Sequence, residues 1–225
     1  MKLSSVVLSV LLSLTFTNSG LASGISSEEA QDFVQKTLNP SKKSRDASDK
    51  FDTLLDSAAW AQNSMQFFDA RTSHEKTQIY GAVRAYYVNA IRSMTQLPTV
   101  IRNGKVNSIL AQMFLSDEEA AKIINSPITS KILWVKSEGD ISRVRVQLLP
   151  EHTAIDDQTA QVQIFVKKSG DSYKITEIES NGVRFVKLYT LQVKLLGRNV
   201  STAIETLVNK NLIRRSQIEE YSRMK

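Results

Sequence analysis

The sequence predicts an α+β fold in which helices at both ends of the chain enclose a four-stranded antiparallel meander. Before about residue 95 and after Gly182, apolar residues recur every three or four positions, which is typical of amphipathic helices. Between residues 131 and 180 the period changes to two, which is typical of strands with one buried face. We therefore expect a single domain over residues 23–225, with the C-terminal helices packed on the apolar face of the sheet.

Residues 1–22 have the three parts of a secretory signal peptide: a positive charge at Lys2, a short apolar run, and small residues at positions 20–22. We expect cleavage after Ala22, with Ser23 as the alternative. An uncleaved membrane anchor is the other interpretation, although the apolar run is shorter than the roughly 20 residues of a spanning helix. The absence of Cys excludes lipid attachment through a Cys, and the predicted location is the periplasm.

The charged residues of the sequence indicate which kinds of binding partner to expect. The 225 residues carry a net charge of +6, and loss of Lys2 with the leader leaves 28 basic and 23 acidic residues, a net charge of +5. This mild excess suits an anionic partner or a membrane surface. It is below the density of Lys and Arg expected of a nucleic-acid binder, so we expect no nucleic-acid partner. A chain of this length can bury a core without disulfides.

The first two helices are predicted between the leader and residue 61. The first covers residues 26–38, with Ser26 or Ser27 as its N-cap and acidic residues in its first turn. The second covers residues 44–61 as one continuous helix, because its apolar residues keep helical spacing.

The clearest helix is predicted over residues 73–94. Ser73 is the expected N-cap, and Lys76 at the third following position leaves the capping box incomplete. Residues 98–130 are less regular, and their pattern predicts two short helices over residues 107–114 and 116–124.

Four strands follow, separated by turn residues, over residues 131–139, 141–149, 160–168 and 172–180. In the second strand Val144, Val146 and Leu148 point to one face, and Arg143, Arg145 and Gln147 point to the other. These two arginines, with Lys167 and Lys168, form either an ordinary solvated face or a docking surface for an acidic partner.

Residues 181–199 form a turn and then a helix with an unusually wide apolar arc. On a helical wheel the apolar side chains from residue 185 to 196 cover about 220°, whereas a surface helix needs roughly 100°. We expect this helix to lie between two apolar layers, with a ridge of Lys187, Lys194 and Arg198 in water. The second layer is either another helix or an apolar ligand in a cavity. A helix capped by Ser201 and a charged tail follow.

Signals for catalysis are poor. The two histidines, His74 and His152, lie in a first helical turn and in a polar loop, and no nucleophile, zinc or calcium motif accompanies them. We expect no enzyme activity, no metal and no cofactor. A catalytic site assembled from distant Ser, His and Asp residues is the alternative.

The stretch YKITEIESNGVRFVKLYTLQVKLLGRN, followed by VSTAIETLVNKN, resembles the C-terminal signature of the periplasmic phospholipid-binding family known as MlaC or toluene-tolerance proteins. That signature is a strand ending in Asp-x-x-x-x-Gly-(Val/Ile)-Ser, an apolar helix carrying Tyr and Arg, and a helix rich in Gly and Leu. The matching positions here are Glu177, Gly182-Val183, Tyr189 and Leu207. The departures are Arg184 in place of Ser, Tyr173 in place of Trp, Leu191 in place of Arg, and residues 201–203 in place of Asp-Gly-Leu.

The resemblance implies a carrier that holds phospholipid acyl chains in an apolar cavity between sheet and helices and moves lipid between the outer and inner membranes. The implied partners are an inner-membrane ABC transporter complex and an outer-membrane lipoprotein complex. An assembly module of an envelope complex, with a similar fold and no ligand, is the alternative. The candidate lipid-binding residues are Trp60, Phe67, Tyr86, Tyr87, Trp134, Val146, Leu148, Val162, Ile164, Ile175, Phe185, Leu188 and Tyr189.

Overall fold

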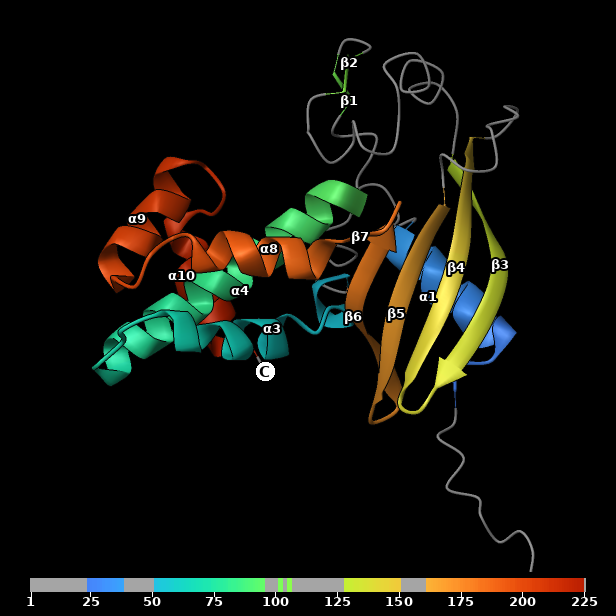
Figure 1. The fold of residues 1–225 in the computed structure, drawn as a ribbon, viewed down its shortest axis with the longest axis horizontal. Helices are drawn as coiled ribbons and strands as arrows, with labels where there is room; N and C mark the ends of the chain where they lie inside the picture. Colours follow the sequence, from blue (N-terminus) through green and yellow to red (C-terminus); the bar gives the residue numbers. More distant parts are fainter. Residues whose placement is uncertain are drawn as a thin grey trace, which may run out of the picture.

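The computed structural model describes residues 24–38, 51–95, 101–102, 105–106, 128–150 and 161–224. The predicted α+β class is confirmed. A sheet lies at one end of the molecule and a group of helices at the other (Figure 1). The predicted signal peptide and its cleavage site lie outside these residues.

The main sheet is an antiparallel meander of neighbouring strands, from β3 to β7 in chain order. The bounds are β3 Ile128–Glu138, β4 Ile141–Pro150, β5 Gln161–Ser169, β6 Ser172–Ser180 and β7 Val183–Arg184. The four predicted strands are present, and the count of four was wrong because β7 adds a fifth. The turn before β7 has positive φ at Asn181 (49°) and Gly182 (77°), as a two-residue Asn-Gly hairpin requires.

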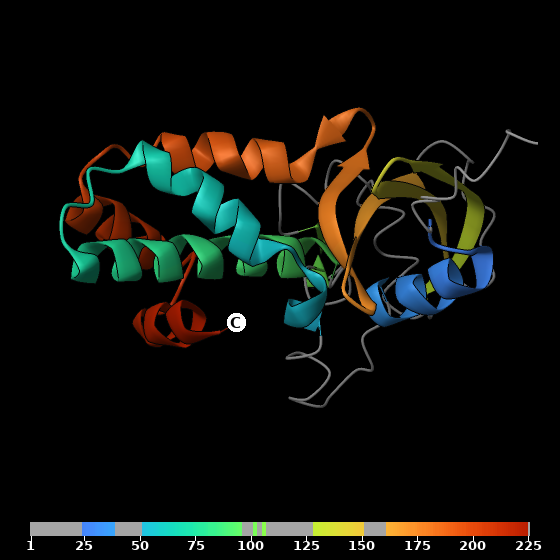
Figure 2. The same ribbon diagram turned by 90° about the horizontal axis from the view of Figure 1, so that it is seen from below.

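The inner face of the sheet is covered by α1 (Ser27–Leu38), around which the strands curve in Figure 2. A complete capping box fixes the start of α1: the Glu29 amide donates to Ser26 Oγ (3.2 Å) and the Ser26 amide donates to Glu29 Oε2 (2.8 Å). The Ile25 amide donates to Ser142 Oγ on β4 (3.2 Å), which ties this end of the helix to the sheet.

The helical part is built around α4. Its elements are α3 Ser57–Ser64, the 3-10 turn η1 Met65–Phe67, α4 Ser73–Thr95, α8 Phe185–Lys194, α9 Val200–Asn209 and α10 Arg215–Arg223. α3, α8, α9 and α10 all pack on α4, and α8 also contacts β6. The C-terminal helices therefore do not cover the apolar face of the sheet, contrary to the prediction. The physical reason is that the middle of α4, residues 81–88, is buried on every side, so this part of α4 is their main packing partner.

The helix predicted over residues 44–61 is interrupted. Residues 51–54 are helical, but Leu55 forms a parallel bridge with Ile175 in β6, and the Asp56 amide donates to the Ile175 carbonyl (2.9 Å). The Asp56 amide thus bonds to the sheet rather than within a helix, and α3 starts anew at Ser57. Residues 44–50 lie outside the described part of the chain.

Two predicted N-caps were wrong by one and two residues. The cap of α4 is Thr72 instead of Ser73, and it forms a complete capping box with Glu75: the Glu75 amide donates to Thr72 Oγ1 (3.1 Å) and the Thr72 amide to Glu75 Oε2 (2.9 Å). The cap of α9 is Asn199 instead of Ser201, and its Oδ1 accepts from the Thr202 amide (2.9 Å).

In the region between residues 98 and 130 the structure describes a small antiparallel pair, β1 Ile101–Arg102 with β2 Lys105–Val106, and the start of β3. The two short helices predicted there lie outside the described residues.

Candidate functional site

An aromatic cluster lies where α3, α4 and α8 meet. The rings of Trp60 and Tyr87 have centroids 5.7 Å apart, and Tyr86 lies 6.0 Å from both Tyr87 and Tyr189. Phe185 extends the cluster along α8, 6.5 Å from Tyr189. All five side chains are buried. The structure thus brings together five of the predicted lipid-binding residues from three helices.

The polar atoms of this cluster have partners. The Tyr87 hydroxyl lies 2.9 Å from Ser64 Oγ and 2.8 Å from Thr190 Oγ1. Tyr86 donates to Gln192 Oε1, and the Trp60 indole donates to the Thr176 carbonyl of β6 (3.1 Å). The sequence did not reveal these polar partners, because Ser, Thr and Gln at these positions form no motif.

Burial also sets the protonation state of the cluster. Desolvation raises the pKa of Tyr86 to about 12, and it raises the pKa values of Tyr87 and Tyr189 above the usual value of 10. The three hydroxyls therefore stay neutral at physiological pH. All three also bond to protein partners, so they are polar groups satisfied within an otherwise apolar interior.

The apolar interior continues from the aromatic cluster to the inner face of the sheet. Val146, Val162, Ile164 and Ile175 are buried on that face and belong to the same hydrophobic cluster as the aromatic side chains. The strand register places Val146 opposite Val162. Residues of the sheet and of the helices therefore form one connected apolar core.

The other predicted lipid-binding residues do not all lie in this apolar core. Trp134 is a correction: it pairs with Arg145, on the face of the sheet opposite to Val146, so it cannot line an interior with the others. The cause is a register shift between Ile132 and Trp134, which breaks strict alternation at Leu133. Phe67 and Leu188 are half-buried at the edge of the core. The side chain of Leu148 lies outside the described residues.

The helix α8 is only partly enclosed. Phe185, Val186, Tyr189 and Val193 are buried, but 53% of Leu191 and 84% of Leu195 are exposed. The prediction that only a basic ridge of this helix meets water was wrong, because no described helix or strand packs over Leu191 and Leu195.

Glu177 anchors the start of α8. Its carboxylate accepts from the amides of Val186 (2.7 Å), Lys187 (3.2 Å) and Ile178 (2.9 Å). An anion at this position also interacts favourably with the helix dipole. Burial nevertheless raises the pKa of Glu177. The hydrogen bonds from the three backbone amides lower this pKa, but by less than burial raises it. The acidic position of the sequence signature is thus a helix cap.

We expect Glu177 to make the protein less stable as the pH rises above about 4.5, its ordinary pKa. Above this pH the unfolded chain loses the proton while the folded chain still holds it, so the free energy of unfolding falls until the raised pKa is passed. Urea unfolding of the wild type and Glu177→Gln over this range measures the effect. The stability advantage of the wild type should shrink with pH, and growth of that advantage would contradict the prediction.

Neither a metal site nor a membrane-spanning helix is found among the described residues. No group of three or more His, Cys, Asp or Glu side chains is placed to hold a metal ion within those residues. None of the helices described is both long and apolar enough to cross a membrane. His74 is exposed, and His152 lies outside the described part of the chain.

Comparisons with known proteins give a structural likeness, but no match to a family model and no significant match to a curated protein. The solved structure of a phospholipid-binding protein from Ralstonia solanacearum, in complex with a phospholipid, is similar at 14% identity and a TM-score of 0.41. The match covers 74% of this chain and 76% of that chain. At this identity and TM-score the likeness establishes neither fold nor ligand, so this chain must be interpreted from its own residues.

Proposed function

We propose that this protein is a periplasmic carrier that binds the acyl chains of a phospholipid in its apolar interior, without catalysing a reaction and without a cofactor. The observation that carries the proposal is the connected apolar core that runs from the inner face of the sheet to the aromatic cluster. Lipid sites have this composition: mostly apolar and aromatic side chains with a few oriented polar groups. The hydroxyls of Tyr86 and Tyr87 are polar groups within this core, and both are held in place by neighbouring side chains.

The sequence supports the finer parts of the proposal. The leader in residues 1–22 is of the type that directs export, and the signature around Glu177 and Gly182 resembles that of periplasmic phospholipid carriers. We infer that the carrier moves lipid between the outer and inner membranes. Its partners would then be the outer-membrane lipoprotein complex and the inner-membrane ABC transporter complex that the resemblance implies.

The direct experiment is native mass spectrometry of the mature protein, purified after export to the periplasm, with extraction and identification of the bound lipid. We expect one phospholipid per protein. A protein that carries no lipid and takes up none from vesicles would overturn the proposal.

A space-filling substitution tests whether the interior holds a ligand. Val146 is fully buried on the inner face of the sheet. If lipid occupies the space beside it, Val146→Trp should displace the lipid and leave the stability of the lipid-free protein nearly unchanged. If the interior is filled by protein alone, the larger ring should lower the free energy of unfolding by about 1–3 kcal/mol.

Val208→Trp is the matched control, because Val208 packs at the edge of the core on α9, away from the sheet. It should leave lipid content unchanged. Loss of stability in Val146→Trp with no bound lipid in the wild type would favour the assembly module over the carrier.

A further inference from the structure

An apolar ridge runs along the exposed side of α8, and we call Leu188, Leu191 and Leu195 the leucine ridge. Leu191 and Leu195 are 53% and 84% exposed, and Leu188 is half-buried. With 100° per residue the three side chains fall within about 60° of the helical wheel. The buried residues of the helix lie on its opposite side: Phe185, Val186, Tyr189 and Val193.

The charge around the leucine ridge is positive. Lys187 and Lys194 are exposed on the same helix, and neither has an ion-pair partner among the residues that the structure describes. Arg198 is instead engaged by Asp69, with Nη2 2.7 Å from Oδ1. The sequence has no acidic residue between Glu179 and Glu205. The leucine ridge is therefore flanked by two lysines that form no ion pair with the described residues.

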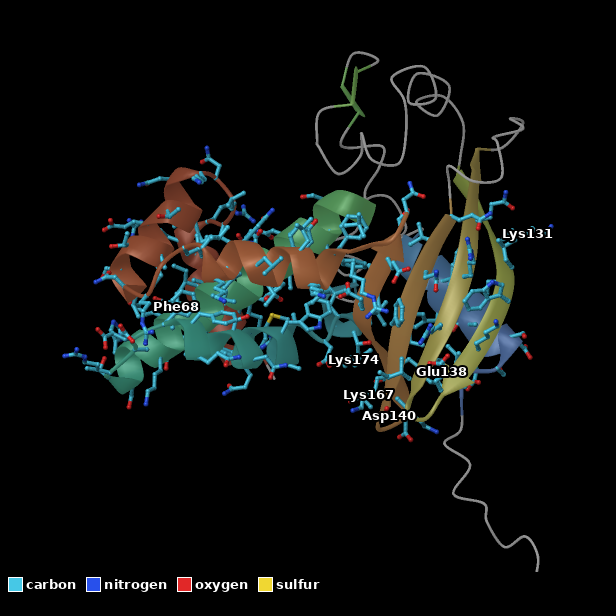
Figure 3. All side chains as sticks on the ribbon, viewed as in Figure 1. Phe68, Lys131, Glu138, Asp140, Lys167 and Lys174 are labelled. Atoms are coloured by element: carbon cyan, nitrogen blue, oxygen red, sulfur yellow. The ribbon has the colours of Figure 1, made fainter. Side chains whose placement is uncertain are left out.

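The face of the sheet opposite to α1 lies on the same side of the molecule as α8 (Figures 1 and 2). Cations lie over two aromatic rings of that face: Lys136 (5.0 Å) and Arg145 (6.0 Å) over Trp134, and Arg143 (5.4 Å) and Arg184 (5.2 Å) over Phe165. Figure 3 shows the side chains of these strands in the same view as Figure 1. Lys131 lies near one end of β3. This side of the molecule thus combines the leucine ridge with basic groups. Phe165 itself is only 7% exposed, and Arg143 and Arg184 also pair with Glu138 and Glu179.

We propose that the leucine ridge, with Lys187 and Lys194, docks this protein on the surface of an anionic phospholipid bilayer. A helix that lies in the bilayer interface has this pattern, with leucines inserted below the headgroups and lysines beside the phosphates. A second copy of the chain fits less well, because pairing two ridges would bring these lysines together. The proposal goes beyond the interior lipid site and does not depend on it.

Sedimentation with sucrose-loaded vesicles tests the docking. The wild type should bind vesicles of phosphatidylglycerol mixed with phosphatidylcholine, and bind phosphatidylcholine alone more weakly. Lys187→Gln with Lys194→Gln should weaken binding to the mixed vesicles about 30-fold, or near fivefold for each Lys, with little change on phosphatidylcholine alone. Leu191→Gln with Leu195→Gln should weaken binding to both kinds of vesicle about tenfold.

Leu212→Gln and Lys210→Gln are the matched controls, because Leu212 is 39% exposed and Lys210 is exposed at the end of α9, away from the leucine ridge. Both should bind vesicles like the wild type. The proposal is overturned if the ridge variants sediment like the wild type, or if the controls lose as much binding. It is also overturned if sedimentation velocity shows a dimer that the leucine variant abolishes.

Lipid extraction from the same preparations separates this proposal from the carrier function. The ridge variants should keep the lipid content of the wild type while they lose vesicle binding. Equal vesicle binding by wild type and variants, with lipid still in the interior, overturns the docking surface alone. Absence of interior lipid, with the vesicle results as expected, overturns the carrier alone.

Discussion

Replacing Asp52 with alanine is expected to lower the free energy of unfolding by about 3–5 kcal/mol. Asp52 is 5% exposed, and its carboxylate accepts from Arg92 of α4 and from the Tyr221 hydroxyl of α10 (2.6 Å). Removal of this carboxylate leaves the Arg92 guanidinium and the buried Tyr221 hydroxyl without their shared hydrogen-bond acceptor. The cost of stranding them exceeds the net value of the bonds themselves.

Urea unfolding followed by circular dichroism measures this loss. Tyr221→Phe, which removes one bond and keeps the ring, should cost about 1–1.5 kcal/mol. Glu219→Ala is the control, because Glu219 forms an exposed ion pair with Arg223 on the same helix and should contribute nothing measurable. A loss in Asp52→Ala no larger than in Glu219→Ala would show that the buried pair does not hold α10 in place.

The second large effect is expected from Gly81→Ala, where α4 packs directly against the backbone of α10. A Cβ at Gly81 would lie 2.2 Å from the Ile218 carbonyl oxygen, which is backbone and cannot rotate away. Alanine favours the helix over glycine by about 1 kcal/mol, but the displaced α10 should cost more. We expect a net loss of about 1–3 kcal/mol in the free energy of unfolding.

The displacement of α10 has a readout of its own. Arg84, buried on α4, donates to the Tyr221 carbonyl (3.3 Å) and to the Met224 carbonyl, so movement of α10 breaks both bonds. Hydrogen exchange should therefore rise in residues 215–224 of Gly81→Ala before it rises in the sheet. Gly139→Ala is a useful comparison, because that position is open and has positive φ (63°), so its effect should stay local to the β3–β4 turn. Wild-type stability in Gly81→Ala would contradict the expected clash.

The two networks at Asp52 and Gly81 hold α10 on α4 without using residues of the proposed lipid site. Variants at these positions should therefore change stability more than lipid content. This separation allows a loss of lipid in Val146→Trp to be distinguished from general unfolding.

The sequence alone was sufficient for the class of fold and for most element positions. Period-two alternation located β3 to β6, because a sheet with one buried face needs apolar side chains at every second position. The spacing of Ile79, Val83 and Tyr87 located α4 in the same way. Among the aromatic residues of the predicted helices, the sequence also pointed to five that the structure brings into one cluster: Trp60, Tyr86, Tyr87, Phe185 and Tyr189.

Only the tertiary structure decided which surfaces meet. Leu55 left its helix because its backbone pairs with Ile175, and Trp134 turned outward because of a register shift at Leu133. The sequence could not show that α10 binds α4, since Asp52, Arg92 and Tyr221 are far apart in the chain. Nor could it show that Leu191 and Leu195 stay uncovered. A local pattern records that a side chain is apolar, but the packing of distant segments determines whether protein, lipid or water lies against it.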